Sequence, residues 1–162
     1  MQSGSLKEEI KTKPDNPYAQ AKDTLRKKME ELQKKADFNL KWIRLFYMYG
    51  KGQSPNSILS QLEAAIEKGE KVFNMSGGEQ LRDYLPVEQV AQYIVKISMQ
   101  DKISGIINCC SGQPLSIREL VKNYLAEKNK SIELNLGYYP YSDYEPMEFW
   151  GDDTKLRKIL DK

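Results

Sequence analysis

Apolar positions between residues 18 and 36 recur at intervals of three and four residues, which is the period of a helix with one buried face. Asn16 is a favourable N-cap residue, and Pro17 suits the first helical position. The pattern predicts one long helix whose core-facing stripe consists of Tyr18, Lys22, Leu25, Met29 and Leu32. The ordinary interpretation of the lysine is a side chain that runs along the edge of the stripe with its ammonium in water.

Residues 40–50, LKWIRLFYMYG, form a continuous apolar and aromatic run of strand length that ends at a glycine. A strand that is apolar on both faces and follows a long helix is typical of a parallel sheet covered by helices. The alternation continues, with helices predicted at 58–70, 88–100, 114–129 and 154–160, and strands at 71–75 and 105–112. Ser116 and Glu119 have the spacing of a capping box at the start of the helix at 114–129. Residues 1–15 are polar and lack a period, so we expect an irregular arm there.

The composition argues against several classes of partner. Charged residues make up 30% of the 162 residues, but the net charge is only +2 and the two signs are interleaved. No basic patch for nucleic acid is therefore expected. No apolar run approaches the roughly 20 residues that span a bilayer, and no signal sequence is visible. We expect a cytoplasmic protein that binds neither nucleic acid nor membranes.

The cysteine and histidine content narrows the chemistry. Cys109 and Cys110 are adjacent in a predicted strand and point to opposite faces, so a disulfide between them would be strained. They are expected to be buried, free thiols in a protein that resides in a reducing compartment. The chain has no histidine, which excludes Ser-His and Cys-His nucleophile systems and most zinc sites. No metal site is predicted, and proton chemistry near neutral pH must use a carboxylate, a lysine, a tyrosine or a thiol.

A tyrosine and a lysine four residues apart occur three times, and helical spacing alone does not choose among the pairs. The pairs are Tyr18/Lys22, Tyr47/Lys51 and Tyr124/Lys128. The second straddles the end of a predicted strand, and the third lies late in a helix among charged residues. Only the first combines a capped helix start with a core-facing stripe.

Five segments in a fixed order carry a resemblance to a known family. They are NPYAQAK (16–22), RLFYMYGKGQ (44–53), LRDYLPVEQVAQYIV (81–95), GIINCCSGQPLSIRELV (105–121) and EPMEFWGDDTKLRKIL (145–160). Over roughly residues 14–160 the chain resembles the C-terminal half of an extended short-chain dehydrogenase/reductase of the NAD-dependent epimerase/dehydratase family. Within that superfamily it is similar to nucleotide-sugar epimerases, dehydratases and 4-ketoreductases.

The resemblance implies an α/β fold made of the C-terminal part of a Rossmann-like parallel sheet and a smaller substrate-binding subdomain. Residues 1–53 would be the remnant of the Rossmann-like domain. Residues 54–162 would form most of the substrate-binding subdomain, with segments that return to the main sheet. The implied reaction is hydride transfer at C4 of a nucleoside-diphosphate sugar with NAD or NADP.

The resemblance also implies roles for individual residues. Tyr18 would be the general acid/base, and Lys22 would hold the nicotinamide ribose and favour the phenolate, so both would be catalytic and cofactor-binding. Arg82 matches an arginine that commonly contacts the substrate diphosphate, although a surface pair with Asp83 is the alternative. Tyr47 and Gln53 fall where the family's strand ends beside the substrate, but relatives usually have asparagine near the tyrosine.

Two features of the family do not occur in this sequence. There is no Gly-x-Gly-x-x-Gly turn and no P-loop, and no catalytic serine or threonine lies about two dozen residues before Tyr18. We therefore expect that the chain is part of a longer enzyme and inactive alone. The strand at 40–50 would then expose a sheet edge and favour association with another chain or a homodimer.

Other functions remain open on the sequence. The chain could be a truncated paralogue that acts as a dimerisation module, or a domain that binds nucleotide sugars without catalysis. If the chain is part of an enzyme, the visible motifs do not distinguish an epimerase from a dehydratase or a ketoreductase. They also do not identify the nucleotide sugar or distinguish NAD from NADP.

Overall fold

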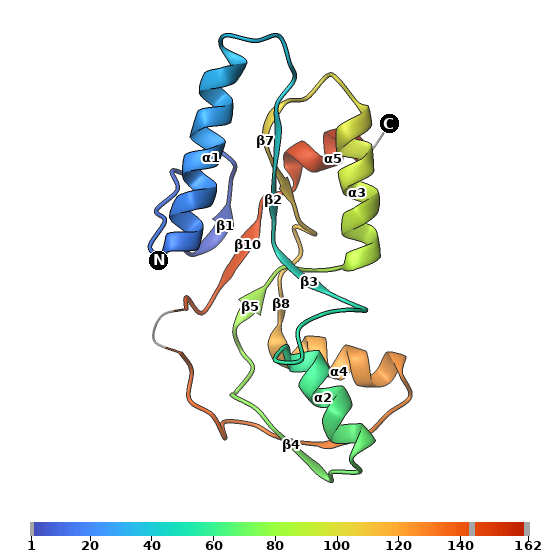
Figure 1. Ribbon diagram of the computed structural model, residues 1–162. Coiled ribbons are helices and arrows are strands. Elements are labelled where there is room, and N and C mark those ends of the chain that lie inside the picture. The colour runs from blue at the N-terminus through green and yellow to red at the C-terminus, as the bar shows by residue number, and fades with distance from the viewer. Residues whose placement is uncertain (1, 143–144, 161–162) are drawn as a thin grey trace.

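A pair of parallel strands at the centre of the fold organises one end of the molecule (Figure 1). The computed structural model describes residues 2–142 and 145–160. The central strands are β2 (Lys41–Leu45) and β7 (Gly105–Cys109), which pair in parallel along their whole length. Around them lie β1 (Gly4–Leu6), α1 (Pro17–Gln33), α3 (Val87–Met99), β10 (Phe149–Gly151) and α5 (Thr154–Leu160). Figure 1 shows α1 on one side of the strands, and α3 and α5 on the other.

The other end of the molecule is a smaller helix-rich unit. Its elements are α2 (Ile58–Glu67), β4 (Val72–Asn74), α4 (Ile117–Glu127) and β9 (Glu133–Asn135). Between the two ends lie β3 (Tyr47–Tyr49), β5 (Leu81–Arg82), β6 (Tyr84–Pro86) and β8 (Leu115–Ser116). β3 and β6 pair in parallel, as do β4 and β9, whereas β5 and β8 are antiparallel.

The predicted alternation of helices and parallel strands is confirmed. The Asn16 side chain accepts a hydrogen bond from the N–H of Ala19 at 2.9 Å, so α1 begins where the sequence indicated. α4 begins with the predicted capping box between Ser116 and Glu119. α1 ends at Gln33 rather than at residue 36, since the backbone turns towards β2 there.

The expected irregular arm at residues 1–15 was wrong in part, because this segment contributes a strand. β1 pairs in parallel with β10, from Gly4 opposite Phe149 to Leu6 opposite Gly151. The arm is also held by Asn108, which donates to the Leu6 carbonyl at 2.8 Å and whose backbone N–H donates to the Glu8 carboxylate at 3.0 Å. These partners come from distant parts of the chain, so the local pattern of apolar and polar residues could not predict the strand.

The predicted orientation of α1 was wrong. Tyr18 is 73% exposed, and Leu25 and Leu32 are about half exposed. The buried residue of this helix is Asp23, which accepts from Thr12 of the arm at 2.8 Å and forms ion pairs with Arg26 and Lys27. Hydrogen bonds from Lys27, Arg26 and Thr12 hold the pKa of Asp23 well below its usual range. Polar contacts therefore attach the helix to the N-terminal arm, and the apolar side chains of its stripe are exposed.

The apolar run at 40–50 forms two strands rather than one. It breaks at Phe46 into β2, which pairs with β7, and β3, which pairs with β6. Within residues 2–142 and 145–160, β2 has β7 as its single strand neighbour, so its other edge carries no ladder. The break directs the chain from the central strands towards the smaller unit.

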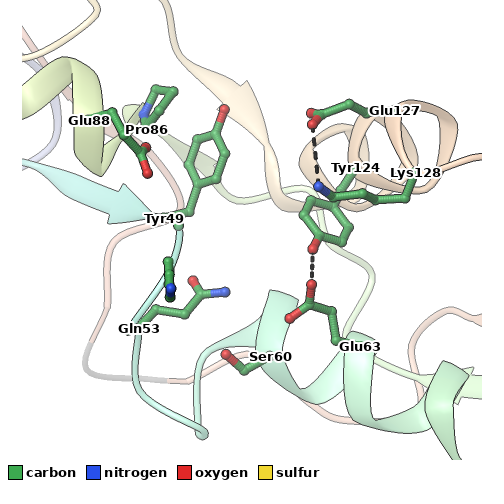
Figure 2. A pocket seen from close by; sticks show the side chains of 12 residues that line it. Tyr49, Gln53, Ser60, Glu63, Pro86, Glu88, Tyr124, Glu127 and Lys128 are labelled. Atoms are coloured by element: carbon green, nitrogen blue, oxygen red, sulfur yellow. Dashed lines mark hydrogen bonds and ion pairs between the residues drawn. The ribbon is translucent and has the colours of Figure 1, made fainter.

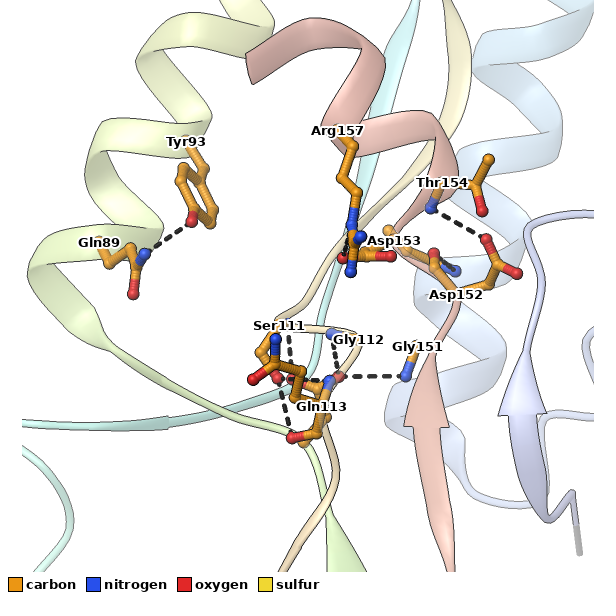
Figure 3. Close-up of polar contacts among 12 residues, drawn as sticks. Gln89, Tyr93, Ser111, Gly112, Gln113, Gly151, Asp152, Asp153, Thr154 and Arg157 are labelled. Atoms are coloured by element: carbon orange, nitrogen blue, oxygen red, sulfur yellow. Dashed lines mark hydrogen bonds and ion pairs between the residues drawn. The ribbon is translucent and has the colours of Figure 1, made fainter. Parts of the chain in front are cut away.

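A buried carboxylate joins the segment between β5 and β6 to the ends of β7 and β10. Asp83 has no exposed surface, and its oxygens accept from the backbone N–H groups of Ser111 at 2.7 Å, Gly112 at 3.0 Å and Gly151 at 3.3 Å. Figure 3 shows these groups converging between the end of β7 and β10. A Cβ atom at Gly151 would lie 2.5 Å from the Cys110 sulfur, so only glycine lets this backbone approach so closely.

The two cysteines are free and buried, as the sequence indicated. Burial raises the pKa of the Cys109 thiol to about 11 and raises that of Cys110 further. The side chains therefore stay protonated and pack as small apolar groups. In the described part of the chain, no helix combines the length and apolar character needed to cross a bilayer.

Replacement of Asp83 by asparagine should destabilise the chain strongly. The amide would turn one acceptor into a donor that faces backbone N–H groups, which costs about 2–4 kcal/mol of the free energy of unfolding. Urea unfolding followed by circular dichroism measures the loss. Asp37→Asn, at an exposed position, is the matched control and should change the stability by less than about 0.5 kcal/mol. Equal stability of the two variants would contradict the role of Asp83.

Candidate functional site

Tyr18 and Lys22 lie one turn apart at the start of α1, where the Asn16 cap fixes the first turn. The Lys22 ammonium is 5.7 Å from the centroid of the Tyr18 ring. Both side chains are exposed rather than core-facing, so the ordinary reason for this spacing, packing of a stripe, does not apply to them. A phenol and an ammonium are thereby presented together to solvent.

An open cavity of about 790 Å³ lies between this pair and one face of β2. Its walls are mainly apolar and include Trp42, Ile43, Leu45 and Phe46. Tyr47 and Phe149 close the end that is nearest the smaller unit. The structure thus brings Tyr18, Lys22 and Tyr47 of the predicted site to one cavity. We call it the Tyr18 cavity.

A second cavity of about 350 Å³ contains the other predicted substrate residues. Gln53 and Arg82 line it together with Tyr84, Glu145 and the first turn of α2. Tyr47 lines both cavities and therefore forms the boundary between them. We call the second one the Arg82 cavity.

The boundary is an aromatic cluster. The Tyr47 ring lies 5.4 Å from that of Tyr84 and 5.9 Å from that of Phe149, both tilted. The Arg82 guanidinium lies 4.7 Å from the centroid of Phe149. Burial raises the pKa of Tyr84 to about 12, so its hydroxyl remains a neutral donor at physiological pH. A flat or ring-shaped ligand that passed between the cavities would meet aromatic surface on this wall.

Arg82 is almost completely buried, at 1% exposure. Its guanidinium donates to the carbonyls of Leu81 at 2.9 Å and Met147 at 3.3 Å, and to the Glu145 carboxylate at 3.2 Å. The alternative of a surface pair between Arg82 and Asp83 was wrong, because both are buried and Asp83 is satisfied by backbone N–H groups. Glu145, which is partly exposed, is the ion-pair partner of Arg82 among the described residues.

The sequence did not single out Tyr84, Glu145 or Phe149 as site residues. The first belongs to the LRDY segment and the others to EPMEFW, but nothing in either segment says which side chains face a cavity. Glu145 lies 63 residues from Arg82, so its ion pair leaves no periodic signal. Chance pairing of opposite charges in a chain with 30% charged residues is too frequent to be informative.

Comparison with known proteins agrees with this architecture. The family described as "NAD dependent epimerase/dehydratase family" matches residues 2–110. A curated relative, dTDP-6-deoxy-L-talose 4-dehydrogenase (NAD(+)) of Aggregatibacter actinomycetemcomitans, is 34% identical over 139 residues. The match covers 85% of this chain and 51% of that protein.

Solved structures share the fold at lower sequence identity. UDP-N-acetylglucosamine 4-epimerase from Methanobrevibacter ruminantium M1, in complex with UDP-N-acetylmuramic acid, has a TM-score of 0.82 at 24% identity. The match covers 97% of this chain and 51% of that one. UDP-glucuronic acid 4-epimerase from Bacillus cereus, in complex with UDP-glucuronic acid and NAD, has a TM-score of 0.79 at 23% identity, with 99% and 51% covered. The chain therefore spans about half the length of each of these proteins and has their Rossmann-like α/β fold over that part.

The two members of the Arg82–Glu145 pair should differ in their effect on stability. Arg82→Met leaves buried carbonyls without a donor and should lower the free energy of unfolding by about 3 kcal/mol. Glu145→Gln removes a partly exposed charge and should cost less than about 1 kcal/mol. Urea denaturation of both variants checks the difference. A Glu145 variant as unstable as the Arg82 variant would show that the carboxylate, rather than the carbonyls, is the main partner of Arg82.

Proposed function

This chain belongs to the NAD-dependent epimerase/dehydratase family, and from that premise we propose that it provides the acid/base pair and the nucleotide-sugar pocket of an NAD(P)-dependent enzyme. The proposed reaction is hydride transfer at C4 of a nucleoside-diphosphate sugar. The curated relative acts on a dTDP-6-deoxysugar, and the mainly apolar walls of the Tyr18 cavity favour a substrate with few hydroxyl groups there. Epimerase and reductase outcomes of this transfer use the same residues.

The observation that carries the proposal is that the two cavities share Tyr47 in their linings. Tyr18 and Lys22 lie in one, Arg82 and Gln53 lie in the next, and Tyr47 belongs to both. A nucleoside-diphosphate sugar has a neutral ring at one end of an anionic linker. In this arrangement the ring would lie beside Tyr18, and the diphosphate would approach Arg82 along the aromatic boundary.

The residues of the Tyr18 cavity fit one end of a nicotinamide cofactor. A phenol and an ammonium are exposed one turn apart at its mouth, and Lys22 would hold the hydroxyl groups of the cofactor ribose. The cofactor, when bound, supplies the hydride chemistry. Tyr18 would take a proton from the sugar hydroxyl, or return it, and the Lys22 ammonium would stabilise its phenolate.

Binding at the second cavity would require Arg82 to exchange partners. Substrate phosphate would take the place of the Glu145 carboxylate on the guanidinium, while the two carbonyls keep it in position. Gln53 would donate to or accept from the sugar or the linker. Tyr47 stands where relatives usually have asparagine, so we infer that it supplies aromatic surface in place of an amide hydrogen bond.

The open edge of β2 and the exposed stripe of α1 are part of the same proposal. We infer that residues 1–53 complete a Rossmann-like sheet through a further strand on this edge, while residues 54–162 supply most of the substrate unit. The unpaired N–H and C=O groups of the β2 edge and the exposed side chains of Leu25, Leu32 and Leu45 favour such an association over solvent. The two free thiols agree with a reducing, cytoplasmic location.

Replacement of Tyr18 by phenylalanine should abolish most of the activity. Loss of a positioned acid/base lowers the turnover rate by about 10²–10⁴-fold. Lys22→Met should also reduce turnover and weaken binding of the dinucleotide. The assay follows NAD(P)H absorbance with dTDP- and UDP-sugars, in the longest native form of the protein that contains this sequence.

Tyr138→Phe and Lys28→Met are the matched controls, since both residues are exposed and lie outside the two cavities. They should retain full activity. A Tyr18→Phe protein that turned over at the wild-type rate would refute the assigned role.

Binding of the nucleotide sugar should depend on the aromatic boundary. Tyr47→Ala removes surface shared by both cavities and should weaken the affinity for a nucleoside-diphosphate sugar about ten-fold, with Tyr138→Ala as control. Calorimetry with dTDP-glucose and UDP-glucose measures the effect. Unchanged affinity in the Tyr47 variant would place the ligand elsewhere. If the unmodified protein binds the nucleotide sugar but neither binds nor needs NAD(P), a binding domain would be favoured over an enzyme.

A further inference from the structure

A third cavity, of about 630 Å³, is lined by neither Tyr18 nor Arg82 and shares Tyr49 and Gln53 with the Arg82 cavity. It is enclosed by the loop after β3, by α2, by the first turn of α3 and by the end of α4 (Figure 2). Its volume is that of a site for a small organic molecule. Figure 2 shows Tyr49 and Glu88 on one side of it, and Glu63, Tyr124 and Lys128 on the other.

Its aromatic walls are two tyrosines that project from the hydrophobic core of the smaller unit. Tyr49 comes from β3 and Tyr124 from α4, and both pack their rings against buried residues of α2 and α4. Their hydroxyl ends meet the polar part of the cavity. The rings are therefore fixed, and a ligand would meet preformed surface rather than mobile side chains.

Carboxylates outnumber ammonium groups in the lining. The acidic residues are Glu63, Glu88 and Glu127, and the basic residues are Lys51 and Lys128. Lys128 is paired with Glu127 at 3.7 Å. Glu63 accepts a hydrogen bond from the Tyr124 hydroxyl. Neither Glu63 nor Glu88 has an ion-pair partner within residues 2–142 and 145–160, so two carboxylates remain without a cation on opposite sides of the cavity.

The chain already places one ammonium against this wall. The Lys128 ammonium lies 5.6 Å from the centroid of the Tyr124 ring and beside Glu127. A cation held between an aromatic face and a carboxylate is a favourable arrangement. Tyr49 and Glu88 line the other side of the cavity, and Glu88 forms no ion pair with any residue of the described chain. The lining can thus accommodate a cationic ligand in addition to the lysine that the protein itself provides.

The titration of both phenols agrees with a negative local potential. Burial and the hydrogen bond to Glu63 raise the pKa of Tyr124 to about 12, and burial together with Glu127 and Glu88 raises the pKa of Tyr49. Both hydroxyls stay protonated at physiological pH. A cation would relieve the repulsion among the carboxylates, whereas an anion would add to it.

We propose that this cavity binds a small aliphatic di- or polyamine. One ammonium would lie between Glu63 and Tyr124, and a second between Glu88 and Tyr49, with the methylene chain across the two rings. Tyr18 and Arg82 do not line this cavity, and of the predicted site residues Gln53 is the one that does.

Calorimetric titration of the chain with spermidine and putrescine at 0.15 M salt tests the proposal. One saturable site per chain is expected, because weak surface attraction is largely screened at this ionic strength. Glu63→Gln and Glu88→Gln should each weaken the affinity at least five-fold. Both glutamates are exposed, so the variants should fold, and circular dichroism verifies this.

Glu67→Gln is the matched control, since it removes an exposed carboxylate that lies one turn after Glu63 on α2 and outside the cavity. It should leave the affinity unchanged. Succinate, which has the opposite charge, should not bind. Absence of saturable amine binding, or equal weakening by all three variants, would overturn the proposal whatever the result of the nucleotide-sugar experiments.

Discussion

A carboxylate withdrawn from water needs donors within the fold, and Asp83 finds them in backbone N–H groups of Ser111, Gly112 and Gly151. These groups follow β7 and end β10, while the Asp83 carbonyl accepts from Tyr47 of β3. One buried residue therefore fixes three strands with respect to one another. Because Tyr47 and Phe149 are carried on two of these strands, the boundary between the Tyr18 and Arg82 cavities depends on this contact.

The attachment of α1 follows a different principle and has a direct consequence for chemistry. Its buried face is polar, with Asp23 bonded to Thr12 and paired with Arg26 and Lys27. A helix held in this way does not need its apolar stripe for attachment to the described part of the chain. Tyr18 and Lys22, which belong to that stripe, are consequently turned to the open cavity beside β2.

The three cavities differ in the charge they favour. Apolar walls surround Tyr18, a buried arginine faces the second cavity, and unpaired carboxylates face the third. Tyr49 and Gln53 line both the second and the third, so the short loop after β3 lies between the proposed diphosphate site and the proposed amine site. Opposite charge preferences a few residues apart explain why overall net charge, at +2, is uninformative about ligands.

The sequence by itself determined the alternation of helices and strands, the cap at Asn16 and the capping box at Ser116. Each of these depends on residues within one or two turns of one another, so local pattern suffices. Tertiary structure alone decided that β1 exists, that the stripe of α1 is exposed, that Arg82 is buried against Glu145, and that Tyr47 joins two cavities. These outcomes depend on partners outside the same helix or strand, such as Glu145 for Arg82, which lies 63 residues away, and a period measured along the chain carries no information about such partners.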